Sequence, residues 1–256
     1  MEVSARFTGP AKVRPPLTAA EQRYLWLEPF RPPLNWRVRK RLTQLVAGLG
    51  PDVELLDIGG RESPYTVGVP ARVTVTDVPQ STDVQRALRL GWTDTIRMRM
   101  EKERSNISRL VLDDMTRSSL PTGAFDCAVA VEVIEHVDED ERFVAEIARV
   151  LKPGGPVLLT TPNGDHVPNR NPDHRRHYSR AQLSSLLSRH FSEVTVDYAV
   201  VGGVSRRLGQ ISWTRWPFLV PASMAANVVN ALLSTRDLRN VARGTHHLFA
   251  IARNGR

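Results

Sequence analysis

The sequence predicts an α/β fold in which a mostly parallel, doubly wound sheet carries its ligand sites at the carboxyl ends of the strands. Three observations predict it. Five short runs rich in Val, Leu and Ile recur between residues 53 and 161. Stretches with helical periodicity separate these runs, and a glycine turn follows the first one. Strand and helix units in series give a parallel sheet with right-handed crossovers.

The N-terminal segment, residues 1–35, is predicted to be an arm lying over the domain. Its prolines restrict φ and argue against a long helix; they are Pro10, Pro15, Pro16, Pro29, Pro32 and Pro33. A basic helix is expected over residues 35–49, where apolar side chains recur at helical spacing. Gly50 and Pro51 form the stop signal of this helix.

The core is expected over residues 36–201. Its predicted buried strands are residues 53–58, 72–77, 110–112, 126–131 and 156–161. The clearest helix is residues 138–151, where Phe143, Ile147 and Val150 form an apolar stripe and acids fill the first turn. Residues 192–201 and 246–252 alternate like strands but are separated by an insert, residues 202–245. The segment 246–256 is expected to complete the core.

Composition limits the function classes. At 256 residues with 41% apolar content, one domain can bury a substantial core. Cys127 is the single cysteine, which excludes an internal disulfide and a cysteine-rich metal site and favours the reducing cytoplasm. The first residues lack the apolar run of a signal peptide.

The net charge of +8 is unevenly distributed. Residues 1–50 hold nine Lys and Arg against three acids, and residues 201–256 hold eight Arg against Asp237 alone. The middle of the chain is therefore acidic. Basic flanks around an acidic centre indicate segments that meet an anionic partner or surface, although arginines on solvated faces would give the same pattern.

A glycine turn follows the first predicted strand, and an acid ends the second. The turn is the run from Asp57 to Pro64, and Asp77 lies twenty residues after Asp57. Glycines at this position let the backbone approach a ligand, and the acid accepts hydrogen bonds from ribose hydroxyls. A dinucleotide site wants G-x-G-x-x-G, but Arg61 and Pro64 stand where the second and third glycines belong. The spacing therefore disfavours a nicotinamide dinucleotide.

Five later motifs occur in a fixed order. They are Asp113-Asp114-Met115, Leu120-Pro121 with Phe125-Asp126, the run from Val133 to Val137, the run from Val150 to Gly155, and Thr160-Thr161-Pro162-Asn163. With Asp57 and Gly59 they resemble the class I S-adenosylmethionine-dependent methyltransferases, and the branch acting on quinones, sugars and natural products in particular. The resemblance implies a Rossmann-like sheet of seven strands whose last strand is antiparallel, with a helical insert before that strand.

The resemblance also implies S-adenosylmethionine as cofactor and a role for each residue. Asp57 and Gly59, with the extra Gly60 beside them, would face the methionine moiety, and Asp77 would face the ribose. Asp114 and the backbone amide of Met115 would face the adenine. Asp113 competes with Asp114 for that role, because Leu120-Pro121 lies two places late in the pattern.

Methyl transfer needs an aligned nucleophile and a group that removes its proton, and histidine suits that task near neutral pH. We predict His136, just past the fourth strand, as the base, with His166 as the second choice. No metal is predicted. His166, His174, His177, Asp165 and Asp173 offer ligands, but the arginines of the same loop oppose a cation.

The insert contains twenty residues without a charge, 216–235, broken by Pro217 and Pro221. We expect a helical lid over the substrate pocket. The alternatives are an interfacial segment whose tryptophans and arginines meet anionic headgroups at the inner membrane face, and a contact within a homodimer.

The predicted function is methyl transfer from S-adenosylmethionine to a small-molecule, sugar or lipid-linked acceptor, most simply on a hydroxyl oxygen. Two alternatives stay open. The basic flanks suit an RNA or DNA methyltransferase, but the chain has no Asn-Pro-Pro-Tyr motif, and a nucleic acid partner is not expected. The irregular glycine turn suits a non-catalytic binding protein on the same scaffold.

Overall fold

A computed structural model describes residues 15–61, 63–78 and 93–255 of the chain. Residues 1–14 of the expected arm and Glu62 of the glycine turn lie outside the described residues. Seven strands form one sheet in the order β3-β2-β1-β4-β5-β7-β6. Their bounds are β1 Glu54–Ile58, β2 Arg72–Asp77, β3 Ile107–Leu112, β4 Cys127–Val131, β5 Pro156–Pro162, β6 Glu193–Val201 and β7 Thr245–Arg253.

Strand β7 runs antiparallel to both of its neighbours, β5 and β6, and the other pairs are parallel. The predicted α/β class, the Rossmann-like seven-stranded sheet and its antiparallel last strand are therefore confirmed. After β1 the chain forms β2 and β3 on one side of β1, and it then crosses to form β4 on the other side. The turn after β1 thus lies where the strand order reverses, which is the position at which open α/β sheets bind ligands.

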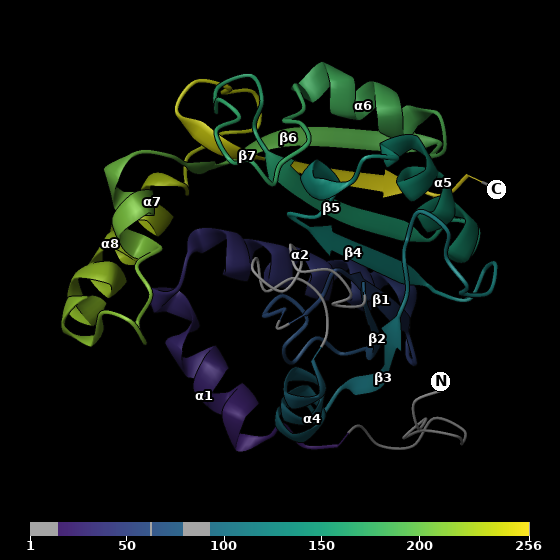
Figure 1. Cartoon of the computed structure of the whole chain (residues 1–256), viewed down its shortest axis with the longest axis horizontal. Helices are drawn as coiled ribbons and strands as arrows, with labels where there is room; N and C mark the ends of the chain where they lie inside the picture. The colour runs from purple at the N-terminus through teal and green to yellow at the C-terminus, as the bar shows by residue number, and fades with distance from the viewer. Residues whose placement is uncertain (1–14, 62, 79–92, 256) are drawn as a thin grey trace.

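Two apolar layers cover the two faces of the sheet, because successive strand residues point to opposite sides. Leu56 faces a layer with Phe143 of α5 (Asp140–Val150) and Leu183 of α6 (Arg180–Ser188). Leu55 faces the other layer, with Leu42 of α2 (Pro33–Leu49) and residues of α4 (Asp94–Glu103). Figure 1 shows α5 and α6 on one side and α2 on the other.

The N-terminal segment contains a short helix, α1 (Ala19–Leu27), followed by the 3-10 turn η1 (Glu28–Phe30). A capping box starts α1: the Thr18 hydroxyl accepts from the Glu21 amide, and the Glu21 carboxylate accepts from the Thr18 amide. Pro29 and Pro32 limit its length. The helix predicted over residues 35–49 begins at Pro33, where the fixed φ of proline suits a first helical position.

The predicted insert is helical. It comprises α7 (Val204–Gly209), the 3-10 turn η3 (Pro217–Leu219) and α8 (Val220–Leu233). Figure 1 shows α7 and α8 beyond the carboxyl ends of the parallel strands. The uncharged run 216–235 thus gives a helix of fourteen residues. Among the described residues, no helix has the length and apolar content that a membrane span requires.

Candidate functional site

The turn after β1 needs glycine at two consecutive positions. Gly59 has a φ of +65°, and a Cβ there would lie 2.7 Å from Cγ2 of Val133. A Cβ on Gly60 would lie 2.6 Å from Cγ of Asp57 and 2.6 Å from Cγ1 of Val75. Both glycines of the predicted cofactor turn are therefore required by close packing and not only by a ligand. Val133 also joins this turn to the segment that follows β4.

Asp57 belongs to a group of buried hydrogen bonds that supports the turn. Its side chain is buried and accepts a hydrogen bond of 2.9 Å from Oγ1 of Thr66. Arg104, also buried, donates to Thr66 Oγ1 and to the carbonyl oxygen of Ser63, at 2.8 and 2.9 Å. Burial raises the pKa of Asp57 to about 6, against the lowering effect of these hydrogen bonds and of Arg104. The geometry gives Asp57 a supporting role, and its contact with a methionine moiety stays a prediction.

The acids after β2 and β3 differ in accessibility. Asp77 is partly buried, and its carbonyl accepts from the amide of Asp113 at 3.0 Å, which ties the two strand ends together. Asp113 is buried and accepts from the amide and hydroxyl of Ser119, both at 2.8 Å. Asp114 is exposed, whereas the Met115 side chain is buried in the core. Of the two competitors for adenine, Asp114 is the accessible one.

A cavity of about 160 Å³ lies at the ends of β4, β6 and β7. Its lining includes Tyr65, Glu132, Val200, Arg206, Asn227 and His247. Glu132 and Val200 are two of the three non-glycine residues with positive φ among the described residues, at 55° and 60°. Such backbone outliers cost free energy and concentrate at functional sites. The cavity is therefore a candidate acceptor pocket.

Glu132 contacts His247 and Thr160 at this cavity. Its Oε1 lies 3.2 Å from Nδ1 of His247 and accepts a hydrogen bond of 3.0 Å from Oγ1 of Thr160. Desolvation alone would raise the pKa of Glu132, but His247 and Thr160 outweigh it and lower that pKa. Desolvation lowers the pKa of the facing Arg206 guanidinium to about 10. Charged groups of both signs thus surround the cavity.

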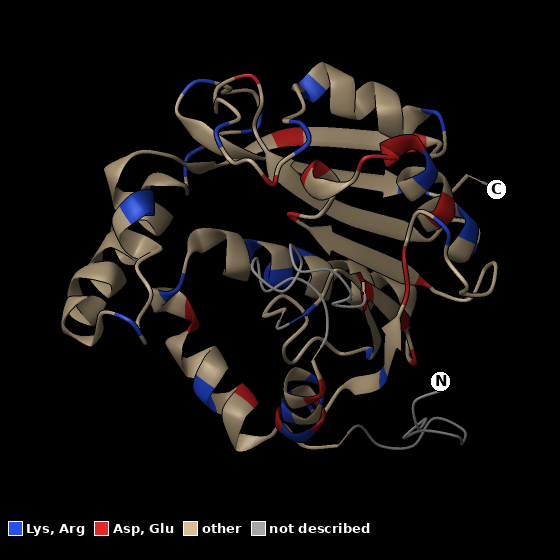
Figure 2. Ribbon diagram, in the orientation of Figure 1, with Lys and Arg blue, Asp and Glu red and all other residues tan. Residues whose placement is uncertain are grey.

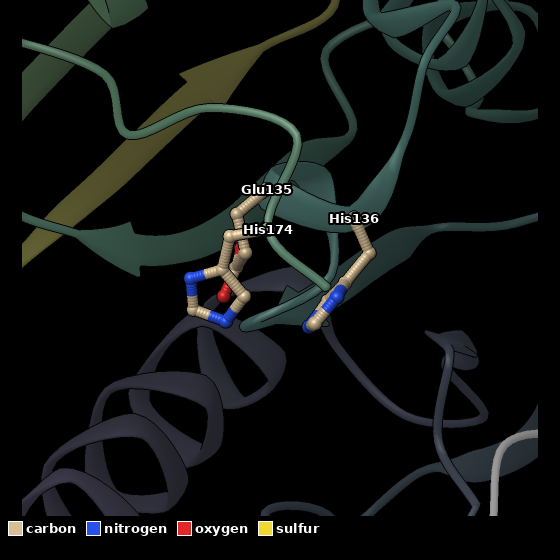
Figure 3. A group of neighbouring side chains, drawn as sticks. All are labelled: Glu135, His136 and His174. Carbon is tan, nitrogen blue, oxygen red and sulfur yellow. The ribbon is translucent and has the colours of Figure 1, made fainter. Parts of the chain in front are cut away.

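A second polar group lies beside it. Glu135 and His136 belong to the 3-10 turn η2 (Ile134–His136), and His174 belongs to the loop before α6. Their side chains converge in Figure 3, and the His136 and His174 rings meet edge to face at 4.7 Å. Burial and the charge of Glu132 raise the pKa of Glu135. Burial, with His136 and His177 nearby, lowers the pKa of His174. We call these three residues the Glu135 cluster.

The structure separates the two histidines predicted as bases. His136 is partly buried in the Glu135 cluster, three residues after the Val133 contact with the glycine turn. His166 is exposed on the turn after β5. The predicted residues at β1, β2, β3 and η2 thus come together at one edge of the sheet, and His166 stays at its surface. Sequence reasoning did not identify Glu132 and His247. The spacing of Glu132, Glu135 and His136 directly after a predicted strand was a signal for the first of them.

The insert contributes to the candidate pocket through one face. Arg206 of α7 and Asn227 of α8 line the cavity, opposite Pro32 and Asn35 of the N-terminal segment. The Asn227 side chain donates to the carbonyl oxygens of Phe30 and Gly209, both at 3.0 Å. The insert and the N-terminal segment therefore contact each other beside the cavity.

Comparison with known sequences finds similarity to methyltransferases. Residues 60–159 match a family described as a methyltransferase domain. A protein of Mycolicibacterium smegmatis, named as a probable S-adenosylmethionine-dependent methyltransferase, is 33% identical over 128 residues, 48% of this chain and 49% of that protein. A ubiquinone biosynthesis O-methyltransferase of Xanthomonas oryzae is 43% identical over 42 residues, 16% of this chain and 18% of that protein. The matched segment thus spans about half of the first relative and less of the second.

Solved structures share the fold at low sequence identity. Phosphoethanolamine N-methyltransferase 2 of Haemonchus contortus, in complex with S-adenosylhomocysteine, matches with a TM-score of 0.56 and 15% identity over 91% of this chain and 57% of that chain. The [4+2]-cyclase SpnF matches with a TM-score of 0.50 and 22% identity over 93% of this chain and 98% of that chain. Because one of these proteins is a cyclase, the fold alone does not fix the reaction.

Proposed function

We propose that this chain is a class I S-adenosylmethionine-dependent methyltransferase that transfers a methyl group from S-adenosylmethionine to an acceptor hydroxyl. The match of residues 60–159 to a methyltransferase domain supports the proposal. The proposal rests chiefly on one arrangement: the glycine turn after β1, Asp77 after β2 and Asp114 after β3 lie side by side at the carboxyl edge. Fold similarity is weaker support, since it shows no reaction.

The residues present fit this cofactor. Gly59 and Gly60 form the tight turn after β1 that the methionine moiety would approach, and Asp77 at the end of β2 would face the ribose. Asp114 is exposed, and its Oδ1 accepts from the amide and hydroxyl of Thr116. Its second carboxylate oxygen would meet the exocyclic amine of an adenine, while Asp113 holds the loop in place. S-adenosylmethionine, when bound, supplies a methyl group on a sulfonium centre that is already a good leaving group.

The acceptor would lie toward β4, β5 and β7. There the charge of Glu132, which lines the cavity, acts on Glu135 of the cluster. For the transfer, the acceptor hydroxyl would have to lie in line with the methyl group and lose its proton. The hydroxyl proton leaves toward the imidazoles of the cluster and then to solvent. We place the proton acceptor with this cluster rather than with the exposed His166.

For the acceptor we propose a small molecule, a sugar or a lipid-linked sugar. A cavity of about 160 Å³ suits a group of modest size, and its charged lining suits a polar one. The lid has an apolar outer surface with arginines beside it, which suits an acceptor carried on a lipid. The short match to a ubiquinone biosynthesis O-methyltransferase supports oxygen as the methylated atom. By this proposal the protein works in the cytoplasm, at or near the inner membrane face.

The test is transfer of label from methyl-tritiated S-adenosylmethionine. The full chain is incubated with hydroxyl-bearing acceptors of the three classes, and the methylated product is identified by mass spectrometry. We expect label in one class as an acid-stable methyl ether. If the chain binds the cofactor but labels none of these acceptors, and labels nothing when cell extracts are supplied as acceptor sources, the non-catalytic alternative would be favoured.

A further inference from the structure

We propose that Glu135, His136 and His174 form a binding site for a divalent cation of the first transition row. Each of the three offers one ligand atom, and these atoms lie within 4.8 Å of one another (Figure 3). Atoms bound to one ion at about 2.0–2.2 Å lie at most about 4.4 Å apart, so small side-chain rotations must bring the three ligand atoms closer together. The sequence had suggested a different set on the 165–177 loop, and only His174 belongs to both sets.

The hydrogen bonds fix both histidines as ligands. Nδ1 of His136 lies 3.0 Å from the carbonyl oxygen of Asp173, so this nitrogen carries the proton and donates it. Its Nε2 therefore keeps a lone pair. Histidines that bind metals usually donate their other ring nitrogen to a carbonyl in this way, which sets the tautomer and the ring orientation.

A relay of the same kind fixes His174. Nδ1 of His177 lies 2.9 Å from the carbonyl oxygen of Val167 and must donate to it, so Nε2 of His177 is an acceptor. Nδ1 of His174 lies 2.8 Å from that Nε2 and supplies the proton. Nε2 of His174 is then left with its lone pair, like that of His136. His177 is a positioning residue for this site.

Glu135 supplies the anionic ligand. The residue is fully buried, and Oε2 accepts a hydrogen bond of 3.1 Å from Oγ1 of Thr161. Oε1 is buried without a hydrogen-bond partner among the described residues. A buried carboxylate oxygen without a partner is costly, and a bound cation removes that cost.

The arginines of the loop do not oppose a cation here. The Arg175 side chain pairs with Asp138 at 3.1 Å, and that of Arg176 pairs with Asp140 at 2.6 Å. The backbone amides of Arg175 and Arg176 donate to the Glu135 carbonyl, at 2.7 and 3.4 Å, and hold the loop against η2. The charge of Glu132 near the site adds to the attraction for a cation.

Two imidazoles and one carboxylate suit Mn²⁺, Fe²⁺, Co²⁺ or Zn²⁺ and leave coordination positions open. An acceptor hydroxyl in an open position would be oriented, and its proton would leave more readily, as for metal-bound water. This role rests on the proposed function and would make His136 a ligand rather than the base. The binding of the cation itself does not rest on it.

The experiment is calorimetric titration of the full chain, freed of metal by a chelator and desalted, with Mn²⁺ and with Zn²⁺. Neither S-adenosylmethionine nor acceptor is present, so failure of methyl transfer and failure of the cation site are distinguished. The variants are H136A, H174A, E135Q and H177A, and H166A with E139Q are the matched controls on exposed residues. Circular dichroism checks the fold of each variant.

We expect one cation per wild-type chain. H136A and H174A should weaken binding at least about tenfold, as should the positioning variant H177A, while the controls bind like wild type. His174 and His177 lie on a loop outside the core, so their variants decide the test even if E135Q fails to fold. Lack of binding by the wild type, or unchanged binding by H136A and H174A, would overturn the proposal.

Discussion

At the scale of single residues, Gly60 is a position in the predicted cofactor turn where close packing requires glycine. A Cβ there would lie 2.6 Å from two side-chain carbons beneath the turn. We predict that Gly60→Ala lowers the free energy of unfolding by about 1–3 kcal/mol, as overpacking does in cores. Gly48→Ala is the control, since a Cβ on that helical glycine meets nothing within 4 Å. It should raise stability by about 0.5–1 kcal/mol. Urea denaturation measures both, and equal effects would contradict the account.

Asp57 gives the stability of the chain a specific pH dependence. The folded chain keeps its proton up to about pH 6, whereas the usual pKa of the group is 3.8. Stability from this residue is therefore present below pH 4 and lost as the pH rises to 6, a change of about 3 kcal/mol. We expect Asp57→Asn to remove that slope and the exposed Asp52→Asn to keep it. Denaturation midpoints at pH 4, 5, 6 and 7 measure the slopes, and parallel curves for wild type and Asp57→Asn would refute the assignment.

At the scale of secondary-structure elements, α8 is polar where it is buried and apolar where it is exposed. Ser223, Asn227 and Asn230 face inward, and Asn230 donates to the carbonyl oxygen of Val201 at 2.8 Å. Val229 and Leu232 are 49% and 64% exposed. Helix α8 itself carries no charge, and the insert around it holds six arginines against the single acid Asp237; Figure 2 shows several of these basic positions. A helix that exposes its apolar side beside cations suits an anionic membrane surface.

This arrangement predicts binding to anionic lipid. Phe218, 70% exposed, and Leu232 would enter the headgroup region. We expect the chain to cosediment with phosphatidylglycerol vesicles at low salt and less with phosphatidylcholine vesicles. The double variant Phe218→Ser/Leu232→Ser should lose most of this binding, while Met98→Ser on α4, 63% exposed, should not. Equal amounts of the double variant and of Met98→Ser in the vesicle pellet would contradict membrane binding through this face. A concentration-dependent dimer that Phe218→Ser disrupts would instead assign the face to contact with a second copy of the chain.

The elements also show what a sequence can reveal. Six strands were predicted within two residues at either end, because four have nearly continuous apolar runs and the last two alternate clearly. The third strand begins at Ile107 rather than at residue 110, since the polar Ser108 and Arg109 interrupt its apolar pattern. The insert was predicted to be helical, but the burial of the polar side of α8 was not. Its buried asparagines donate to carbonyl oxygens of distant segments. Only the folded chain brings those segments together.

At the scale of the whole molecule, the sheet divides the proposed reaction between two halves. The β1, β2 and β3 half carries the predicted cofactor residues, which order and spacing along the chain revealed. The β4, β5 and β7 half carries Glu132, His247 and the Glu135 cluster. These residues come from three distant parts of the sequence, so their meeting depends on tertiary structure. Val133, packed against Gly59, joins the two halves.

The most direct test of the central claim is calorimetric titration of the full chain with S-adenosylmethionine. The account predicts one molecule bound per chain, binding of S-adenosylhomocysteine at the same site, and no binding of NADH. Asp77→Asn and Asp114→Asn should each weaken the affinity at least about tenfold, since each would lose a hydrogen bond to the ligand that involves a charged group. Absence of S-adenosylmethionine binding by the folded wild-type chain would contradict the account.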